Sequence, residues 1–448
     1  MQKAAEKGLA MAEGTMAKAS MPEGERRDGP HRQGPRPLPL HLATVMGSWL
    51  GSRGALSLSR SGSPPWSAAL GPQREAIERA FAGVNPEALA EAIDREGRRR
   101  LGLFLDGVTA YRHHPYRRDL PEAPVIWREG TTRLVDYGGE GVPALVVPSL
   151  INRAYILDLS AERSLLRAWP KMGVRPLLVD WDRPGPLERG FDLTAYIAGR
   201  LEAALDATLA TTSRPPVVVG YCMGGLLALA LAIRRRRDIA GLVLLATPWD
   251  FHAERAAQAR LLAATAGPLA PLIGALGELP VDLLQALFAG IDPFQVPRKF
   301  QAFARLDAGS PRARAFVALE DWLNDGVPLA GSVAIECLVG WYGHNLPGRD
   351  QWRVAGEPVV PAGLGRPTLV VLPAGDRIVP PASASALAAA IPAAERLDPE
   401  AGHIGMIVGG SAEALVWRPV AAWIAACGGE RGEAKPPRRK RRSSAPRG

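Results

Sequence analysis

The segment from Val217 to Leu227 constrains the fold of this chain more than any other stretch of its sequence. Three valines, Val217–Val219, lead into a glycine-rich turn over residues 220–225, and an apolar run over residues 226–233 follows. Valine runs favour a buried strand, whereas leucine and alanine favour a helix. A tight strand–turn–helix unit presents the residue at its apex in a strained, exposed position. We therefore expect Cys222 at the tip of a nucleophile elbow.

The residues around Cys222 support this interpretation. Gly220, Gly224 and Gly225 allow the strand and the helix to approach closely. A thiol at the start of a helix meets the positive end of the helix dipole, which favours the thiolate. The alternative is an inert buried cysteine, the usual state of this residue in apolar surroundings. The strand before Cys222 and the helix after it favour covalent acyl chemistry through a thioester.

The rest of the sequence predicts an α/β fold with a mostly parallel central sheet and helices on both faces. Short apolar runs typical of buried strands occur at residues 144–147, 177–180, 217–219, 242–246 and 368–372. Helical patterns lie between them, near residues 159–171, 193–210 and 225–237. Strands that alternate with helices form parallel sheets, and functional residues then lie at the carboxyl ends of the strands.

The same patterns divide the chain into regions. The alternation of strands and helices stops after residue 249. A long helical pattern precedes the next strand, which predicts an inserted helical cap. The expected regions are a disordered N-terminal region 1–70, a helical N-terminal segment 71–120, an α/β-hydrolase core over 121–249 and 366–428, a cap over 250–365, and a basic disordered tail 429–448.

Composition limits the location of the chain and its partners. The 448 residues include only three cysteines, too few for a disulfide framework, which fits a reducing cytoplasm. We expect no transmembrane segment and no secretory signal, because long uninterrupted apolar runs are missing. The net charge of +9 resides mainly at the ends. The run Arg438–Arg442 is typical of a solvated tail, and binding of a polyanion is the less favoured alternative.

Two further residues complete a catalytic pattern. Asp376 follows the last predicted strand, and His403 lies in a glycine-flanked loop before the final helix. The order nucleophile, acid, histidine is the order of the α/β-hydrolase fold. We expect His403 to take the thiol proton of Cys222, and Asp376 to orient the imidazole. The non-catalytic alternative is that Asp376 caps a turn and His403 is a surface residue.

An oxyanion hole requires two backbone N–H groups. Met223, directly after the nucleophile, supplies one, and we expect the loop at residues 150–152 to supply the other, assigned to Ile151. His113 and His114 are adjacent and lack accompanying carboxylates, so we interpret them as a solvated loop and expect no metal site.

With these residues assembled, the chain resembles the polyhydroxyalkanoate (poly-3-hydroxybutyrate) synthase family of the α/β-hydrolase superfamily, above all its short, partner-dependent members. The similar segments are Ser149–Leu159, Leu178–Trp181, Thr247–Phe251, Val379–Ser383 and Gly402–Gly405. The resemblance implies that Cys222 attacks a 3-hydroxyacyl-coenzyme A and releases coenzyme A, and that a polyester grows on the enzyme. His403 would activate the thiol, and Asp376 would assist with the hydroxyl.

The resemblance implies a coenzyme A thioester as substrate, with no cofactor, and either a homodimer or a second synthase subunit as partner. It also implies a cytoplasmic protein at the surface of storage granules. Two positions depart from the family pattern: Arg377 stands where histidine is common, and residues 252–255 replace a Pro-Gly turn. Two other functions stay open, namely a thioesterase or polyester depolymerase with the same triad, and a non-catalytic granule-associated protein.

Overall fold

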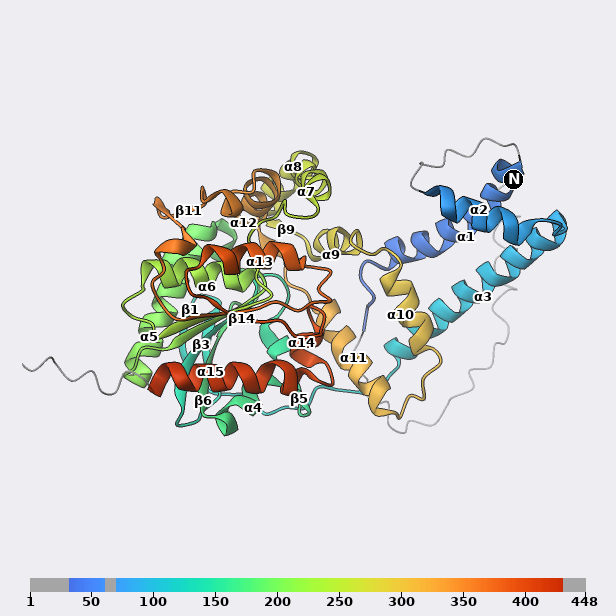
Figure 1. Cartoon of the computed structure of the whole chain (residues 1–448). Helices are drawn as coiled ribbons and strands as arrows, with labels where there is room; N and C mark the ends of the chain where they lie inside the picture. Colours follow the sequence, from blue (N-terminus) through green and yellow to red (C-terminus); the bar gives the residue numbers. More distant parts are fainter. Residues whose placement is uncertain (1–31, 61–69, 430–448) are drawn as a thin grey trace, which may run out of the picture. The chain divides into compact units, whose positions relative to one another are not determined.

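The computed structural model describes residues 32–60 and 70–429 (Figure 1). The basic run Arg438–Arg442 and the predicted disorder of residues 1–31, 61–69 and 430–448 lie outside these described residues.

An eight-stranded sheet forms the centre of the fold and confirms the predicted fold class. Its strands are, in spatial order, β1 (Val125–Glu129), β2 (Thr132–Asp136), β6 (Val174–Asp180), β3 (Val142–Val147), β7 (Val217–Tyr221), β8 (Gly241–Leu245), β13 (Thr368–Val371) and β14 (Glu395–Leu397). The strands from β6 to β14 are parallel, whereas the β1–β2 hairpin adds to β6 in the antiparallel direction. The carboxyl ends of β3, β7, β8 and β13 therefore meet at one edge of the sheet.

Helices cover both faces of this sheet, which explains why its central strands are apolar throughout. In β3, Leu145 and Val147 face one core, while Ala144 and Val146 face the other. The first core receives α6 (Met223–Arg234) and α13 (Pro381–Ala390), and the second receives α15 (Arg418–Gly429). Figure 1 shows α15 on the opposite side of the sheet from α6 and α13. Successive side chains of a strand point to opposite faces, so a strand buried on both sides lacks polar positions.

Two stretches differ from the predicted elements. The helix expected near residues 159–171 is divided into the hairpin β4 (Asp158–Ser160) and β5 (Arg163–Ser164), α4 (Leu165–Ala168), and the 3₁₀ turn η3 (Trp169–Met172). Ser164 ends the hairpin and caps α4 by accepting the Arg167 N–H at 3.0 Å. Strand β14 was not foreseen, because Glu395 and Arg396 are exposed on an edge strand without an apolar run.

Residues 246–367, between β8 and β13, form mainly helices. These are α7 (Ala256–Ala264), α8 (Ala266–Leu276), α9 (Val281–Ala289), α10 (Gln295–Phe303), α11 (Pro311–Asn324), α12 (Gly331–Ile335) and the π-helix η6 (Glu336–Gly343). Two short antiparallel pairs lie within this insertion. Strand β9 (Glu278–Leu279) pairs with the distant β10 (Leu329–Ala330), and β11 (Arg353–Val354) forms a hairpin with β12 (Glu357–Pro358). Within the described ranges no individual helix has the length and apolarity of a membrane span, although the bent pair α7–α8 passes that test as a unit.

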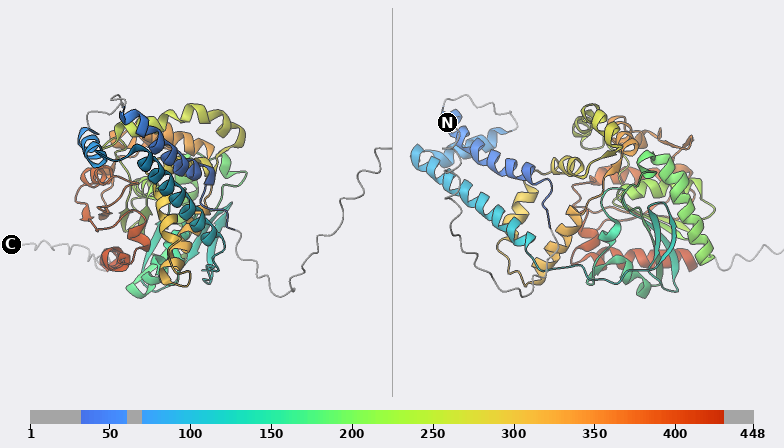
Figure 2. Two further views of the ribbon diagram at one scale, coloured as in Figure 1. Left: turned by 90° about the vertical axis from the view of Figure 1, so that its right-hand side faces the viewer. Right: turned by 180° about the vertical axis from the view of Figure 1, so that it is seen from behind.

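Before the sheet, three helices precede the core: α1 (Leu38–Arg60), α2 (Gly71–Phe81) and α3 (Pro86–Arg112). Helix α1 contradicts the predicted disorder for residues 38–60. It packs along α3 (Figure 2), where the Trp49 ring lies over Gly97 and its Nε1 donates to Asp94 at 3.0 Å. This long-range packing stabilises a segment whose glycines and serines disfavour a helix in isolation.

Candidate active site

The structure places Cys222 at a sharp turn between β7 and α6. Its backbone angles are φ 56° and ψ −127°, a region that non-glycine residues seldom adopt. The turn is held by the N–H of Cys222, which donates to the carbonyl of Leu245 on β8 at 2.9 Å. The strained backbone is therefore fixed by the neighbouring strand, and the side chain is half-buried at the carboxyl edge of the sheet.

Three glycines around Cys222 lie where no side chain fits. A Cβ on Gly220 would collide with the backbone of Gly225, and one on Gly224 would collide with the carbonyl of Val147. A Cβ on Gly225 would overlap the Thr247 side chain. The close approach of β7, α6 and the neighbouring strand ends thus requires glycine at all three positions.

Asp376 and His403 lie together beyond the ends of adjacent strands, β13 and β14. His403 Nδ1 lies 2.6 Å from Asp376 Oδ2. The other carboxylate oxygen, Oδ1, accepts the N–H groups of Ile378 and Val379 at 2.8 and 2.9 Å. Both side chains are buried. The carboxylate therefore has a fixed orientation, and it holds the imidazole with Nδ1 as the hydrogen-bonded nitrogen.

His403 also meets Cys222. Burial disfavours the charged imidazolium, but the charge of Cys222 and the hydrogen bonds with Asp376 and Cys222 outweigh it and raise the pKa of His403 to about 10. The structure thus brings together Cys222, His403 and Asp376, the three side chains to which the sequence assigns catalytic roles, in the arrangement that a thiol nucleophile requires.

Tyr221 is a site residue that the sequence analysis did not single out. Its ring stacks on the His403 ring with centroids 5.3 Å apart, and its hydroxyl donates to the His403 carbonyl at 3.1 Å. Burial, together with the charges of Cys222 and Asp376, raises the pKa of Tyr221 well above its ordinary value, so it stays a neutral phenol. The sequence signal for Tyr221 was its position directly before the predicted nucleophile, Cys222.

Cys222 opens into a mainly apolar cavity of about 380 Å³. Cys222 and Met223 line it on the side of the elbow, and apolar residues of the cap line it opposite, including Phe251, Leu284, Leu287, Phe288, Cys337, Leu338, Trp341 and Tyr342. Cys337, interpreted from sequence as a core residue, is buried and faces this same cavity. Such a chamber suits an apolar acyl group.

The two expected oxyanion donors differ in their surroundings. The Met223 N–H belongs to the first turn of α6, whose leading N–H groups have no partner within the helix. The Ile151 N–H instead donates to the Ser149 hydroxyl at 2.9 Å, although Ile151 does line the cavity. The assignment of Ile151 therefore stays a prediction, and it requires this local bond to open.

Two arginines, Arg255 and Arg377, are among the residues that line the cavity. The Arg255 guanidinium donates to the Arg377 carbonyl at 3.3 Å, which links the start of α7 to the loop after Asp376. Arg377 has a side chain that is 77% exposed, and it lies 3.5 Å from Asp292. Asp292 is bound more closely by Arg298, at 2.6 Å. The Arg377 guanidinium is therefore available to a ligand.

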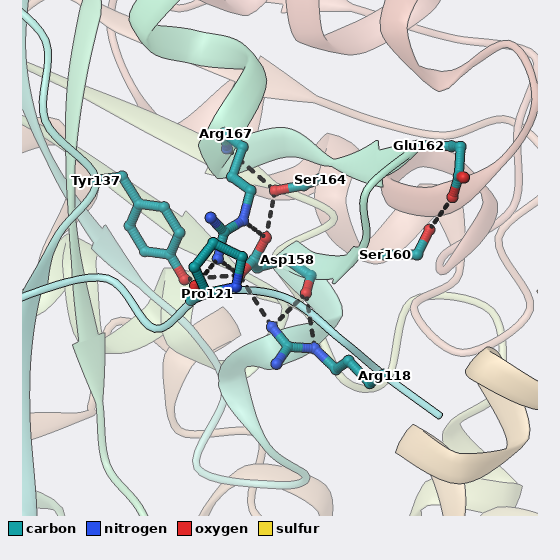
Figure 3. Close-up of polar contacts among 8 residues, drawn as sticks. All are labelled: Arg118, Pro121, Tyr137, Asp158, Ser160, Glu162, Ser164 and Arg167. Carbon is teal, nitrogen blue, oxygen red and sulfur yellow. Dashed lines mark hydrogen bonds and ion pairs between the residues drawn. The ribbon is translucent and has the colours of Figure 1, made fainter. Parts of the chain in front are cut away.

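A second buried carboxylate, Asp158, belongs to one of the segments that carry the family resemblance (Figure 3). It accepts hydrogen bonds from Arg118 at 3.0 Å, and from Arg167 Nε and Nη2 at 2.7 and 3.0 Å. Ser164 and Tyr137 donate to it at 2.6 and 3.2 Å. Both carboxylate oxygens are thus fully engaged by donors, and this cluster joins β4, α4 and the segment before β1.

The other described histidines have separate surroundings. Within the described ranges, groups of three or more His, Cys, Asp or Glu with metal-binding spacing do not occur. His113 is exposed at the end of α3, as expected for a loop. His114, however, is buried, with Nε2 2.9 Å from the Ala308 carbonyl, which corrects the prediction of a solvated side chain.

The chain is similar to several known proteins. Two similar relatives are the "Poly(3-hydroxyalkanoate) polymerase subunit PhaC" of Haloarcula marismortui, 26% identical over 323 residues, and that of Haloferax mediterranei, 26% identical over 316 residues. These matches cover 68% and 67% of this chain, and 68% and 63% of the relatives. An alpha/beta hydrolase fold protein from Nakamurella multipartita is 21% identical with a TM-score of 0.42, covering 68% of this chain and 99% of that one.

The family model described as the alpha/beta hydrolase fold matches residues 179–410. This range begins within β6 and includes Cys222, Asp376 and His403. Because the match extends over more than half of the 448 residues, the chain belongs to the alpha/beta hydrolase fold family.

Proposed function

We propose that this protein is an acyltransferase that polymerises 3-hydroxyacyl-coenzyme A into polyhydroxyalkanoate through a covalent thioester on Cys222. The observation that carries the proposal is the cysteine at the strained elbow, which faces a mainly apolar cavity and meets the His403–Asp376 pair. The polymerase names of the relatives support the same reaction.

The proposed reaction begins with transfer of the acyl group to the enzyme. The Cys222 sulfur attacks the thioester carbonyl, and its proton resides on His403. A bond forms between the carbonyl carbon and Sγ, the bond to the coenzyme A sulfur breaks, and the imidazolium protonates the departing thiolate. The Met223 N–H lies next to the nucleophile, where it stabilises the negative charge that develops on the carbonyl oxygen.

Elongation uses the same residues, but His403 now accepts a proton instead of donating one. The 3-hydroxyl of an incoming hydroxyacyl-coenzyme A loses its proton to neutral His403 and attacks the acyl-enzyme carbonyl, which forms an ester and frees the Cys222 sulfur. The lengthened chain, now a coenzyme A thioester, then acylates Cys222 again, and coenzyme A leaves. Asp376 stabilises the imidazolium and fixes its orientation. The acyl group is held on Cys222 as a thioester, and the thiolate is a good leaving group. Each transfer therefore converts a thioester into a more stable ester.

We assign the phosphate groups of coenzyme A to Arg255 and Arg377. Both side chains line the cavity that contains Cys222, and the Arg377 side chain is mostly exposed, with a 3.5 Å ion pair to Asp292. Guanidinium groups bind phosphate with two parallel hydrogen bonds. No further cofactor is needed for this chemistry.

The names of the relatives describe each of them as a polymerase subunit. We propose by analogy that a second synthase subunit is the partner of this chain, and the alternative is a homodimer. A polymerase of a water-insoluble product works where that product accumulates, so we also propose that the protein acts at the surface of storage granules in the cytoplasm.

Incubation of the purified protein with (R)-3-hydroxybutyryl-coenzyme A tests the proposed function. We expect release of coenzyme A together with polyester of high mass. Release of coenzyme A with free 3-hydroxybutyrate and no polymer would identify a hydrolase instead, because water would then be the acceptor. No turnover in the presence or absence of a candidate second subunit would favour a non-catalytic protein.

A further inference from the structure

The outer surface of α7 and α8 lacks the polar residues that solvent-facing helices normally carry. Every exposed residue between Leu261 and Leu276 is leucine, alanine, proline or glycine, and residues 261–277 include no charged side chain. Leu261, Leu272 and Leu276 are 72%, 42% and 45% exposed. We refer to residues 261–276 as the apolar ridge. A surface helix ordinarily places charged residues on its outer face, and a continuous apolar surface indicates a binding surface.

The apolar ridge is continuous with the cavity of the candidate active site. Leu262 and Thr265 line that cavity, and Leu261 both lines it and is mostly exposed. Helix α7 also packs against η6, which contributes Trp341 and Tyr342 to the cavity wall. Figure 1 shows α7 and α8 on the side of the cap away from the central sheet. An apolar chain that leaves the cavity past Leu261 therefore reaches the ridge directly.

The charge distribution identifies the kind of surface that fits the ridge. Anionic membranes attract helices with clusters of lysine and arginine on the polar face. Here Arg255 precedes α7 and Arg260 lies in the middle of that helix, whereas the sixteen residues from Leu261 to Leu276 include no lysine or arginine. An acidic or basic protein surface would likewise find no counter-charge there. An uncharged apolar partner matches the ridge best.

We propose that the apolar ridge is the surface on which the protein docks to its own polyester product. This inference rests on the proposed function, which makes that product an uncharged chain of esters emerging from the cavity. Docking buries Leu272 and Leu276 against the polymer and keeps the opening of the cavity beside it. The elongating chain then passes from Cys222 to the polymer surface without crossing water.

The test compares the double variant Leu272→Gln/Leu276→Gln with the matched control Leu50→Gln/Leu187→Gln. The control replaces two leucines outside the ridge that are even more accessible, at 62% and 64% exposed. Neither pair lines the cavity. Each protein is mixed with protein-free particles of amorphous poly(3-hydroxybutyrate), and binding is measured by co-sedimentation. Initial rates with a soluble 3-hydroxyacyl-coenzyme A are measured in parallel.

We expect the ridge variant to bind the particles about tenfold more weakly than the wild type, since two half-exposed leucines lose their burial. The control variant should bind like the wild type, and the initial rates of all three should agree. Equal particle binding by the ridge variant and the wild type would overturn the proposal. This readout does not depend on turnover, so a protein that binds particles but forms no polymer would contradict the proposed function alone.

Other occupants of the ridge would give different results. Wild-type binding to phosphatidylcholine vesicles that equals its binding to polyester would indicate a general lipid surface and overturn the assignment. A dimer that becomes a monomer in the ridge variant, measured by light scattering, would identify a second copy as the occupant and also overturn it. Ala270→Glu, a helix-compatible change on the exposed ridge, provides an independent variant if the double variant fails to fold. It should lose particle binding in the same way.

Discussion

Asp158 and Asp376 are both buried and both accept several hydrogen bonds, yet their partners differ in kind. Asp158 faces two arginines, a serine and a tyrosine. Asp376 faces two backbone N–H groups and one histidine that also meets Cys222. Arginine keeps its charge at all relevant pH values, whereas histidine gains and loses a proton near neutrality. The first carboxylate therefore fixes structure, and the second is placed to support proton transfer.

Burial and hydrogen bonding alone therefore do not identify a carboxylate as catalytic. The distinguishing feature is whether its partners include a group that can change charge and also reaches a nucleophile. Asp158 lies in a segment that carries the family resemblance, but its partners indicate a structural role. Four predictions separate the two carboxylates, or examine the charged groups next to Asp376.

The largest expected effect is on activity. Asp376→Asn should lower kcat about 10⁴-fold, because the amide no longer stabilises the imidazolium and selects the wrong tautomer. The Asn Oδ1 can still accept the N–H groups of Ile378 and Val379, so the fold should persist. Steady-state kinetics with a hydroxyacyl-coenzyme A measures the loss. The control is Asp398→Asn, an exposed carboxylate paired with Arg396, which should keep wild-type kcat. A wild-type rate in Asp376→Asn would remove Asp376 from the mechanism.

Asp158→Asn should act on stability instead. The change leaves Arg118 and Arg167 facing an amide in place of a carboxylate, and breaking such a buried pair is costly. Both arginines keep partial contact with solvent, so we expect a loss of about 2–4 kcal/mol in the free energy of unfolding. Urea unfolding measures it. Activity per folded molecule should stay within about twofold of the wild type. Unchanged stability with reduced kcat would reverse the roles that we assign to the two carboxylates.

The pH dependence of stability should also distinguish Asp376. The pKa of His403 is raised to about 10 from an ordinary value near 6.5, so the imidazolium stabilises the folded state. This contribution is complete below the unfolded pKa and is lost as pH rises through about 10. The difference in the free energy of unfolding between the wild type and Asp376→Asn should therefore be largest near about pH 6 and should decrease toward about pH 11. A constant gap across this range in thermal or urea unfolding would contradict the assignment.

The smallest predicted effect concerns substrate binding. Arg377→Ala should raise KM for the coenzyme A thioester about three- to tenfold, because one phosphate contact is lost. KM for the N-acetylcysteamine thioester, which lacks the nucleotide, should not change. Arg260→Ala provides the matched control, since this exposed arginine of α7 does not line the cavity. An equal rise in KM for both thioesters would mean that Arg377 acts through the loop of Asp376.

Much of the sheet was predictable from local sequence. The central strands are runs of valine and leucine that bury both faces, so their pattern directly reflects their environment. The elbow was predictable because its glycines are required by close backbone contacts. The chain order of Cys222, Asp376 and His403 pointed to three residues that the fold does bring together.

Other features depend on contacts between distant segments, which local patterns do not report. Helix α1 requires α3, whose Gly97 accommodates Trp49. Asp158 has partners from four separate places in the chain, between residues 118 and 167. By contrast, the hydrogen bond from the Ile151 N–H to the Ser149 hydroxyl is local, and it depends on the geometry of a single turn. Strand β14 is specified by its pairing with β13 rather than by its own composition.

The most direct test of the central claim is the mass of the intact protein shortly after mixing with (R)-3-hydroxybutyryl-coenzyme A. We predict a series of covalent adducts that increase by one hydroxyacyl unit at a time, all on the peptide that contains Cys222. The series should be absent in Cys222→Ala. A single acyl unit on Cys222 that decays to free acid without extension would contradict polymerisation, and adducts that persist in Cys222→Ala would contradict the assigned nucleophile.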